Sequence, residues 1–164
     1  MGLGPDEALA RLREGNVRFA SGASERSDGP VARSSAFATI LTCVDPRVAP
    51  EIVFDVPLGR LFVIRVAGNV AGDLETRSID LAVGLGTPLV IVLGHTDCKA
   101  IERSLTTEHA DPLLDRIREH AAPDDPIRAN ARGNADAVRA AIGDRARVVA
   151  AVYDVTSGRV TFFD

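Results

Sequence analysis

Short apolar runs alternate along this chain with longer segments in which apolar residues recur every three or four positions. The short runs have the length and the Val and Ile content of buried strands, whereas the longer segments have helical spacing. The predicted strands span residues 37–41, 60–66, 88–93, 147–155 and 159–163. The predicted helices span residues 6–19, 48–54, 73–85, 98–105, 113–120 and 127–142. This alternation predicts an α/β fold with a central, mostly parallel β-sheet flanked by helices, in which the last two strands form a hairpin.

The segment before the first predicted strand differs from the rest of the chain. Leu9, Leu12 and Phe19 share one face of its helix, and Asp6 is placed to cap the helix start. Residues 22–30 are rich in Ser, Gly and Asp, a composition typical of a linker. We therefore expect an N-terminal helical arm, which can pack on its own core or reach a partner subunit.

The helix at residues 73–85 carries enough apolar residues to cover part of the sheet. Gly86 follows it and is expected to end it, because glycine readily adopts the left-handed conformation found after helix ends. The predicted apolar face consists of Leu74, Ile79, Leu81, Ala82 and Leu85.

The two cysteines of the chain lie where predicted strands end. Cys43 begins a Cys-Val-Asp-Pro-Arg run after the first strand, and Cys98 ends a Gly-His-Thr-Asp-Cys run after the third. Functional sites in parallel sheets form beyond the carboxyl ends of the strands. Neighbouring strands lie about 4.8 Å apart, a gap that a metal with bonds of about 2.0–2.3 Å can bridge. Two thiolates, the His95 imidazole and the Asp45 carboxylate are a complete set of zinc-type ligands.

Arg47 bears on whether such a zinc site is closed or open. If Asp45 binds the metal, the site is closed and structural, but if water takes the fourth position, the site can catalyse hydrolytic chemistry. Arg47 lies two residues after Asp45, and its guanidinium group can bind a carboxylate at two points. Such an ion pair draws Asp45 away from the metal and keeps it ionised, which favours the open site.

Composition narrows the range of partners and compartments. The net charge of −4, the pI of about 5.4 and the lack of Lys/Arg runs argue against nucleic acid. No apolar stretch reaches the roughly 18 residues of a membrane-spanning helix, and the first residues do not resemble a signal peptide. These features favour a cytoplasmic protein with reduced thiols. A Cys43–Cys98 disulfide is the competing interpretation, and it leaves the neighbouring His and Asp unexplained.

Together these motifs resemble the β-class carbonic anhydrases. The resemblance rests on Cys-x-Asp-x-Arg from Cys43, on Arg-Val-Ala-Gly-Asn at residues 65–69 and on Gly-His-Thr-Asp-Cys ending at Cys98. It extends to Glu-Gly-Asn-Val-Arg-Phe at residues 14–19 and to Val-Tyr-Asp-Val-Thr-Ser-Gly at residues 152–158. The motifs therefore cover most of the chain.

The resemblance implies a zinc enzyme that interconverts carbon dioxide and bicarbonate by attack of a metal hydroxide on carbon dioxide. It implies Cys43, His95 and Cys98 as zinc ligands and Asp45 with Arg47 as the catalytic dyad. It also implies a homodimer or a higher even oligomer, with the N-terminal helix over the neighbouring subunit and the site near the interface. Residues 1–35 would then be the arm and linker, and residues 36–164 a single zinc-binding α/β catalytic core.

Several nearby residues have smaller expected roles or depart from the family pattern. Asp97 is expected to cap the helix that begins near Cys98, and the loop of Gly68 and Asn69 to line the pocket. Lys99 replaces the usual Gly, and Pro46 replaces the usual Ser or Ala and stiffens the dyad loop.

Two other functions fit the same residues. A zinc-dependent hydrolase of carbonyl sulfide or carbon disulfide would use the same ligands, because these linear triatomic molecules resemble carbon dioxide in shape. A non-catalytic zinc protein would keep Asp45 on the metal, and the presence of Arg47 argues against that closure.

Overall fold

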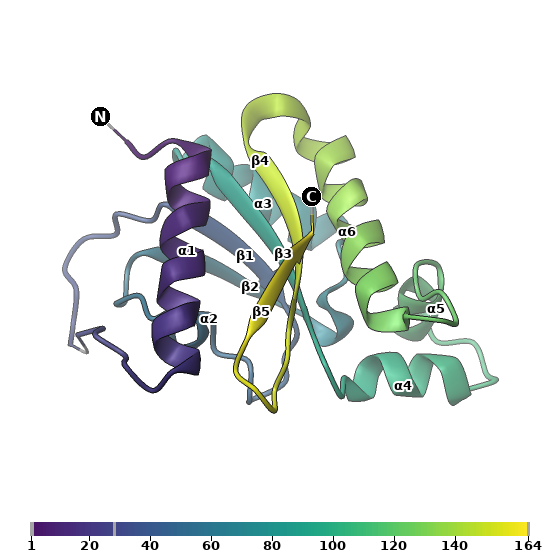
Figure 1. Ribbon diagram of the computed structural model, residues 1–164. Helices are drawn as coiled ribbons and strands as arrows, with labels where there is room; N and C mark the ends of the chain where they lie inside the picture. The colour runs from purple at the N-terminus through teal and green to yellow at the C-terminus, as the bar shows by residue number, and fades with distance from the viewer. Residues whose placement is uncertain (1, 28, 164) are drawn as a thin grey trace.

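The computed structural model describes residues 2–27 and 29–163, which form one sheet with helices packed on both of its faces (Figure 1). The sheet has five strands in the order β2-β1-β3-β4-β5. The first four strands are parallel, and β5 pairs antiparallel with β4, as the hairpin prediction requires. The strands are β1 (Ala38–Thr42), β2 (Leu61–Arg65), β3 (Leu89–His95), β4 (Arg147–Tyr153) and β5 (Val160–Phe163). The predicted α/β fold with a mostly parallel sheet is therefore confirmed.

The helices follow the predicted pattern with small shifts at their ends. They are α1 (Pro5–Ala20), α2 (Pro50–Val53), α3 (Asp73–Gly84), α4 (Lys99–Thr106), α5 (Pro112–Arg118) and α6 (Pro126–Ile142). Two short 3-10 turns, η1 (Ala67–Asn69) and η2 (Gly143–Arg145), complete the regular structure. No helix within the described residues is both long and apolar enough to cross a membrane.

Side chains of the central strand β3 alternate between two apolar cores. Leu89, Ile91 and Leu93 pack with residues of α1 and α2 on one face of the sheet. Val90 and Val92 pack with residues of α3 and α6 on the other face. This period of two explains why a strand covered on both faces appears in the sequence as an uninterrupted apolar run. Figure 1 shows α1 in front of the sheet and α3 behind it.

Helix α1 packs on its own sheet. Leu9 and Leu12 are buried in the first core, as predicted. The amide of Asn16 donates to the carbonyl oxygens of Val53 and Gly158 at 3.0 and 2.9 Å. The arm therefore contacts its own core. The expected cap is absent, because Gly4 is the N-cap residue and Asp6 lies inside the first turn.

A buried carboxylate fixes the end of α1 and the start of the linker. Asp55 follows α2, and its carboxylate accepts hydrogen bonds from Arg18 Nε at 2.6 Å and from the hydroxyl of Ser24. The backbone N–H groups of Glu25 and Arg26 donate to the same carboxylate. Burial by itself would raise the pKa of Asp55, but these hydrogen bonds outweigh it and hold the pKa well below its usual range.

The predicted apolar face of α3 is only partly correct. Ile79 and Ala82 are buried as expected, together with Val83, because these positions form one stripe along the helix. Leu74, Leu81 and Leu85 were also assigned to the buried face and are exposed instead: 76%, 66% and 66% of each residue is accessible. The helix carries two apolar stripes, and the sheet covers one of them.

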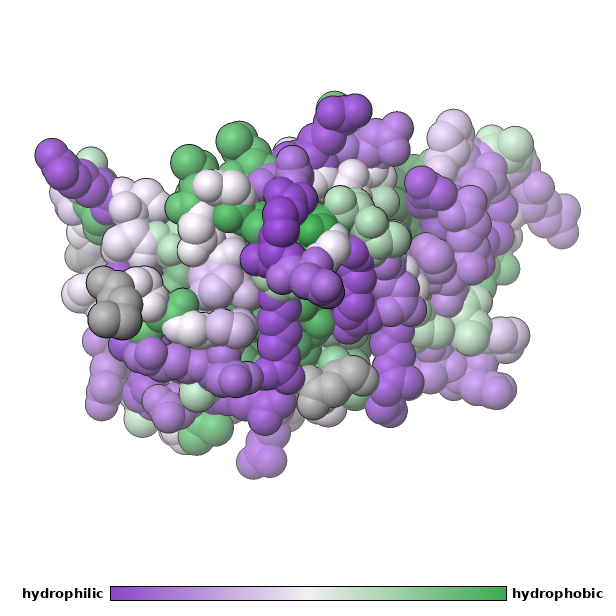
Figure 2. All heavy atoms as spheres, turned by 90° about the horizontal axis from the view of Figure 1, so that it is seen from above, coloured by the Kyte–Doolittle hydropathy of each residue, from purple (hydrophilic) through white to green (hydrophobic). Residues whose placement is uncertain are grey.

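The second stripe of α3 borders the edge strand β2. Leu81 and Leu85 line a groove of about 380 Å³ together with Phe62 and Ile64 of that strand. Figure 2 shows one face of the molecule, from above the view of Figure 1: hydrophilic side chains cover much of it, and apolar side chains gather in limited areas.

Candidate metal centre

Two neighbouring strands bring the predicted ligands together. Strands β1 and β3 pair directly, with Thr42 opposite Leu93, which confirms that they are neighbours. Cys43 is the first residue after β1, and His95 is the last residue of β3. Cys98 immediately precedes α4, and the turn before it contains Asp97 with a left-handed φ of 56°. The three side chains therefore come from two strand ends and one helix start.

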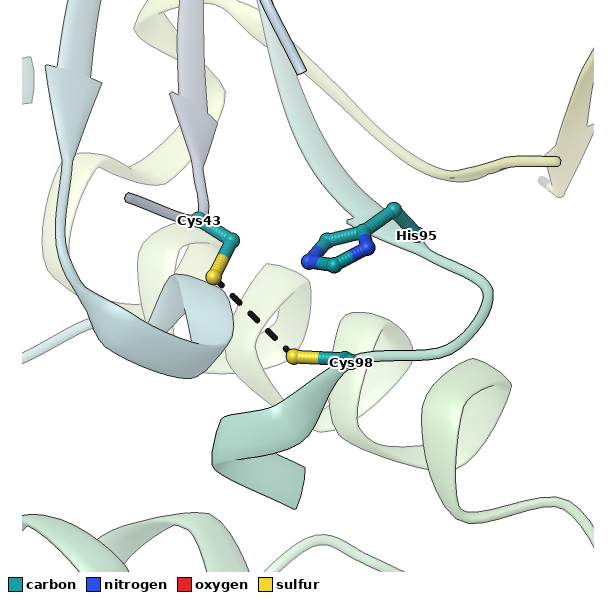
Figure 3. Close-up of side chains that lie close together, drawn as sticks. All are labelled: Cys43, His95 and Cys98. Atoms are coloured by element: carbon teal, nitrogen blue, oxygen red, sulfur yellow. Dashed lines mark hydrogen bonds between the residues drawn. The ribbon is translucent and has the colours of Figure 1, made fainter. Parts of the chain in front are cut away.

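The donor atoms of Cys43, His95 and Cys98 lie within 4.8 Å of one another, and all three residues are buried (Figure 3). The two sulfur atoms are 4.0 Å apart, and both thiols are free, so the disulfide interpretation does not describe this structure. Tetrahedral zinc with Zn–S bonds of about 2.3 Å would place two sulfur ligands about 3.8 Å apart. The observed separation is therefore close to that of a zinc site.

The imidazole of His95 presents a free nitrogen toward the sulfurs. Its Nδ1 lies 2.9 Å from the carbonyl oxygen of Thr96, which makes Nδ1 the protonated nitrogen and leaves the lone pair on Nε2. Nε2 is buried and has no hydrogen-bond partner in the structure. An unsatisfied buried polar atom costs about 1–3 kcal/mol, and a metal bound at Nε2 removes that cost.

The surroundings of Cys43 favour its thiolate. The hydrogen bond from Cys98 lowers the pKa of Cys43 below its usual range, against the opposing effect of burial. The backbone N–H of Gly68 also points at this sulfur, with a nitrogen–sulfur distance of 3.4 Å. Because the thiolate is the form of cysteine that binds metals, these contacts prepare Cys43 for a soft divalent ion such as zinc.

Asp45 is held by Arg47 and lies outside the group of three donors. Arg47 Nε and Nη2 contact the two carboxylate oxygens at 3.0 and 2.7 Å, and the backbone N–H of Arg47 adds a third hydrogen bond at 2.9 Å. The hydrogen bonds from Arg47 lower the pKa of Asp45 to about 2. Asp45 is therefore an ionised hydrogen-bond acceptor that is paired with Arg47 and does not belong to the group of three donors.

Asp97 has a different role from the expected helix cap. Cys98 is the N-cap residue of α4, and no side chain caps that helix. The carboxylate of Asp97 instead accepts a hydrogen bond from Arg47 Nη1 at 2.9 Å and pairs with Lys99 at 3.1 Å. Arg47 thus bridges the loop after β1 and the loop after β3. Sequence spacing did not indicate this contact, because the two residues are 50 positions apart.

Arg65 is a second residue whose role was missed. It ends β2, and its guanidinium group donates to the carbonyl oxygens of Cys43 at 3.1 Å and Asp45 at 2.6 Å. These two bonds fix the backbone that carries one ligand and the dyad carboxylate. Its position in the Arg-Val-Ala-Gly-Asn motif was the only signal in the sequence.

Comparison with known proteins agrees with this geometry. A family model described as carbonic anhydrase matches residues 38–157. Carbonic anhydrase 2 of Mycobacterium tuberculosis is 40% identical over 109 residues, which cover 62% of this chain and 53% of that protein. The chain thus spans about half the length of that relative.

Solved structures share the fold. The β-carbonic anhydrase of Coccomyxa, in complex with acetazolamide, matches with a TM-score of 0.70 at 21% identity over 95% of this chain and 79% of that chain. A carbon disulfide hydrolase in its apo form matches with a TM-score of 0.60 at 24% identity over 95% of this chain and 88% of that chain. At these identities the likeness concerns the fold alone. Since the family match covers well over half of the chain and includes the Cys-His-Cys centre, the chain belongs to the β-class carbonic anhydrase family.

Proposed function

We propose that this protein is a zinc-dependent carbonic anhydrase that catalyses the reversible hydration of carbon dioxide to bicarbonate and a proton. Membership of the family and the cluster of Cys43, His95 and Cys98 support the proposal. The observation that carries it is the ion pair between Asp45 and Arg47, which keeps the carboxylate away from the three donors. A fourth position is then left for water.

The metal would be held by the two thiolates and by Nε2 of His95. Zinc in such a site acts as a Lewis acid, which makes a bound water molecule lose a proton far more readily than free water does. Two thiolates and a neutral imidazole balance the charge of a divalent ion, so the buried centre would carry almost no net charge.

The ion pair of Asp45 and Arg47 would orient the oxygen that attacks carbon dioxide. Because Asp45 stays ionised, it can only accept hydrogen bonds, and an acceptor beside the attacking oxygen turns the lone pair of that oxygen toward the carbon of carbon dioxide. Arg47 keeps the carboxylate in place through two side-chain contacts, and Arg65 fixes the backbone beneath it. The products are bicarbonate and one proton, which passes to solvent or buffer.

Zinc analysis and stopped-flow hydration of the wild type and Asp45→Asn test this proposal. We expect both proteins to contain one zinc per chain, and the variant to lose about 10²- to 10⁴-fold in rate, the usual contribution of an acid–base or orienting group. Asp80→Asn is a matched control, because Asp80 pairs with Arg145 on the exposed surface. Equal hydration rates for Asp45→Asn and Asp80→Asn would remove Asp45 from the mechanism.

Carbonyl sulfide and carbon disulfide are less favoured substrates. The relative at 40% identity is named a carbonic anhydrase, whereas the carbon disulfide hydrolase shares only the fold. Turnover of the sulfur compounds at or above the rate for carbon dioxide would reverse this preference.

We further propose that the protein forms a homodimer or higher even oligomer in the cytoplasm. The exposed leucines of α3 beside the edge strand β2 supply an apolar surface of the kind that subunit contacts bury. Two cysteines that form no disulfide suit a reducing compartment. Light scattering coupled to gel filtration measures the assembly: a monomer at micromolar concentration contradicts it.

A further inference from the structure

The short turn η1 contacts the metal centre through its backbone. Gly68, in this turn, donates its N–H to the sulfur of Cys43. Its φ of 69° lies in the left-handed region, and a Cβ at this position would lie 2.7 Å from Cδ1 of Ile117. Only glycine meets both conditions without strain, so the peptide can approach the sulfur closely.

Two asparagines of α6 support this turn and the residues that follow it. Asn130 is completely buried, and its Nδ2 donates to the carbonyl oxygen of Gly68 at 2.8 Å. Asn134, one helical turn further on, accepts from the backbone N–H of Ala71 through Oδ1 at 2.7 Å. Its Nδ2 donates to the backbone and side-chain oxygens of Asn130 at 2.8 and 3.0 Å.

These hydrogen bonds fix which way each amide points. Asn130 must present Nδ2 to a carbonyl oxygen and Oδ1 to the amide of Asn134. A carboxylate at residue 130 would place an oxygen against the carbonyl of Gly68, and an aliphatic side chain would leave that carbonyl without this donor. The chain of contacts runs from Asn134 through Asn130 and Gly68 to the sulfur of Cys43.

We propose that Asn130 is a positioning residue for the metal centre: by holding the carbonyl group of Gly68, it fixes the turn η1 so that the N–H of the same residue keeps its hydrogen bond to the Cys43 thiolate. This inference rests on the proposed zinc site. An N–H donor withdraws charge from a thiolate, so its strength adjusts how strongly the sulfur donates to a metal. Outer hydrogen bonds of this kind typically change metal affinity by about 10- to 100-fold.

Cobalt substitution tests the proposal independently of catalysis. The wild type, Asn130→Ala and the control Asn16→Ala are loaded with Co²⁺, and their sulfur-to-cobalt charge-transfer bands and rates of cobalt loss to a chelator are compared. Asn16 is a suitable control because it is also buried and makes three hydrogen bonds to the backbone, all of them away from the metal centre.

We expect Asn130→Ala to move the charge-transfer band to longer wavelength, because a sulfur without the N–H donor is richer in electrons. We expect it also to release cobalt about tenfold faster than the wild type, because the loosened turn no longer holds the Cys43 sulfur in its ligating position. Asn16→Ala should lose thermal stability and keep the wild-type band and release rate. If Asn130→Ala does not fold, Asn134→Ala should show the same shift to a smaller degree, because it leaves Asn130 in place but removes its support.

Two outcomes separate this proposal from the proposed function. If both asparagine variants of α6 match Asn16→Ala in spectrum and release rate, Asn130 is purely structural and the inference is wrong, even when the enzyme is active. If the wild type binds cobalt and zinc but does not hydrate carbon dioxide, the proposed activity fails and the shift in the spectrum still decides the role of Asn130.

Discussion

Replacing Asp55 with Asn should destabilise the protein strongly although the two side chains have nearly the same shape. The carboxylate is buried and accepts hydrogen bonds from Arg18, from the Ser24 hydroxyl and from two backbone N–H groups. Asparagine keeps one acceptor oxygen but replaces the other with an NH₂ group, which cannot accept the hydrogen bonds that the second carboxylate oxygen received. It also leaves the guanidinium group of Arg18 without its buried partner.

The size of the effect follows from these contacts. Each hydrogen bond to a charged group contributes about 1.5–3 kcal/mol, so the loss of two of the bonds to the Asp55 carboxylate should cost about 3–5 kcal/mol. At about 2–4 °C per kcal/mol for a chain of this size, the melting temperature should fall by about 10 °C. Urea unfolding followed by circular dichroism, at fixed protein concentration, measures the loss directly. Asp80→Asn removes an exposed carboxylate and should cost no more than about 1 kcal/mol.

The same variant has a predicted pH dependence. The pKa of Asp55 is lower in the folded protein than in the unfolded chain, where it is about 3.9. The contribution of ionised Asp55 to the free energy of unfolding is therefore fully present above the unfolded pKa and is lost as pH falls through the folded pKa. The stability difference between wild type and Asp55→Asn should be constant from pH 7 to 5 and shrink below about pH 4. A loss under about 1 kcal/mol at pH 7, or a difference that persists unchanged at pH 3, would refute this reasoning.

Two further substitutions test the packing of α1 and the role of Asp97. Gly15→Ala would place a Cβ 1.8 Å from the carbonyl oxygen of Phe54, so we expect the free energy of unfolding to fall by about 1–3 kcal/mol. The control Gly84→Ala places a Cβ with no atom within 4 Å and should be neutral or slightly stabilising. Equal stabilities of these two variants would contradict the close approach of α1 to α2. Asp97→Asn weakens an ion pair that is exposed to solvent, so the hydration rate should fall by no more than about fivefold with zinc content unchanged. A hundredfold loss would place Asp97 among the reacting groups.

The sequence predicted the sheet and the three donors because both depend on strong local patterns. The apolar runs that become β1 and β3 were recognisable, and residues at the carboxyl ends of adjacent parallel strands necessarily meet at one edge. The sequence did not show which of two apolar stripes on a helix packs against the sheet. Leu81 and Val83 are both apolar, and only packing on the sheet decides that Val83 is buried and Leu81 is exposed.

The residues that support the centre were the hardest to foresee. Asn130 contacts Gly68 across 62 positions, and Asp97 contacts Arg47 across 50. Asparagine inside a helix and an acidic residue before a helix each have common local roles, so their long-range partners become visible only when the chain is folded. Capping preferences favoured the wrong role for Asp97, which has a left-handed φ of 56° and contacts Arg47 instead.

X-ray absorption spectroscopy at the zinc K-edge of the purified protein tests the central claim most directly. Cys43, His95 and Cys98 should give one zinc per chain with two sulfur neighbours at about 2.3 Å and two nitrogen or oxygen neighbours at about 2.0–2.1 Å. A protein without zinc, or a zinc shell that lacks the two sulfurs, would contradict the account.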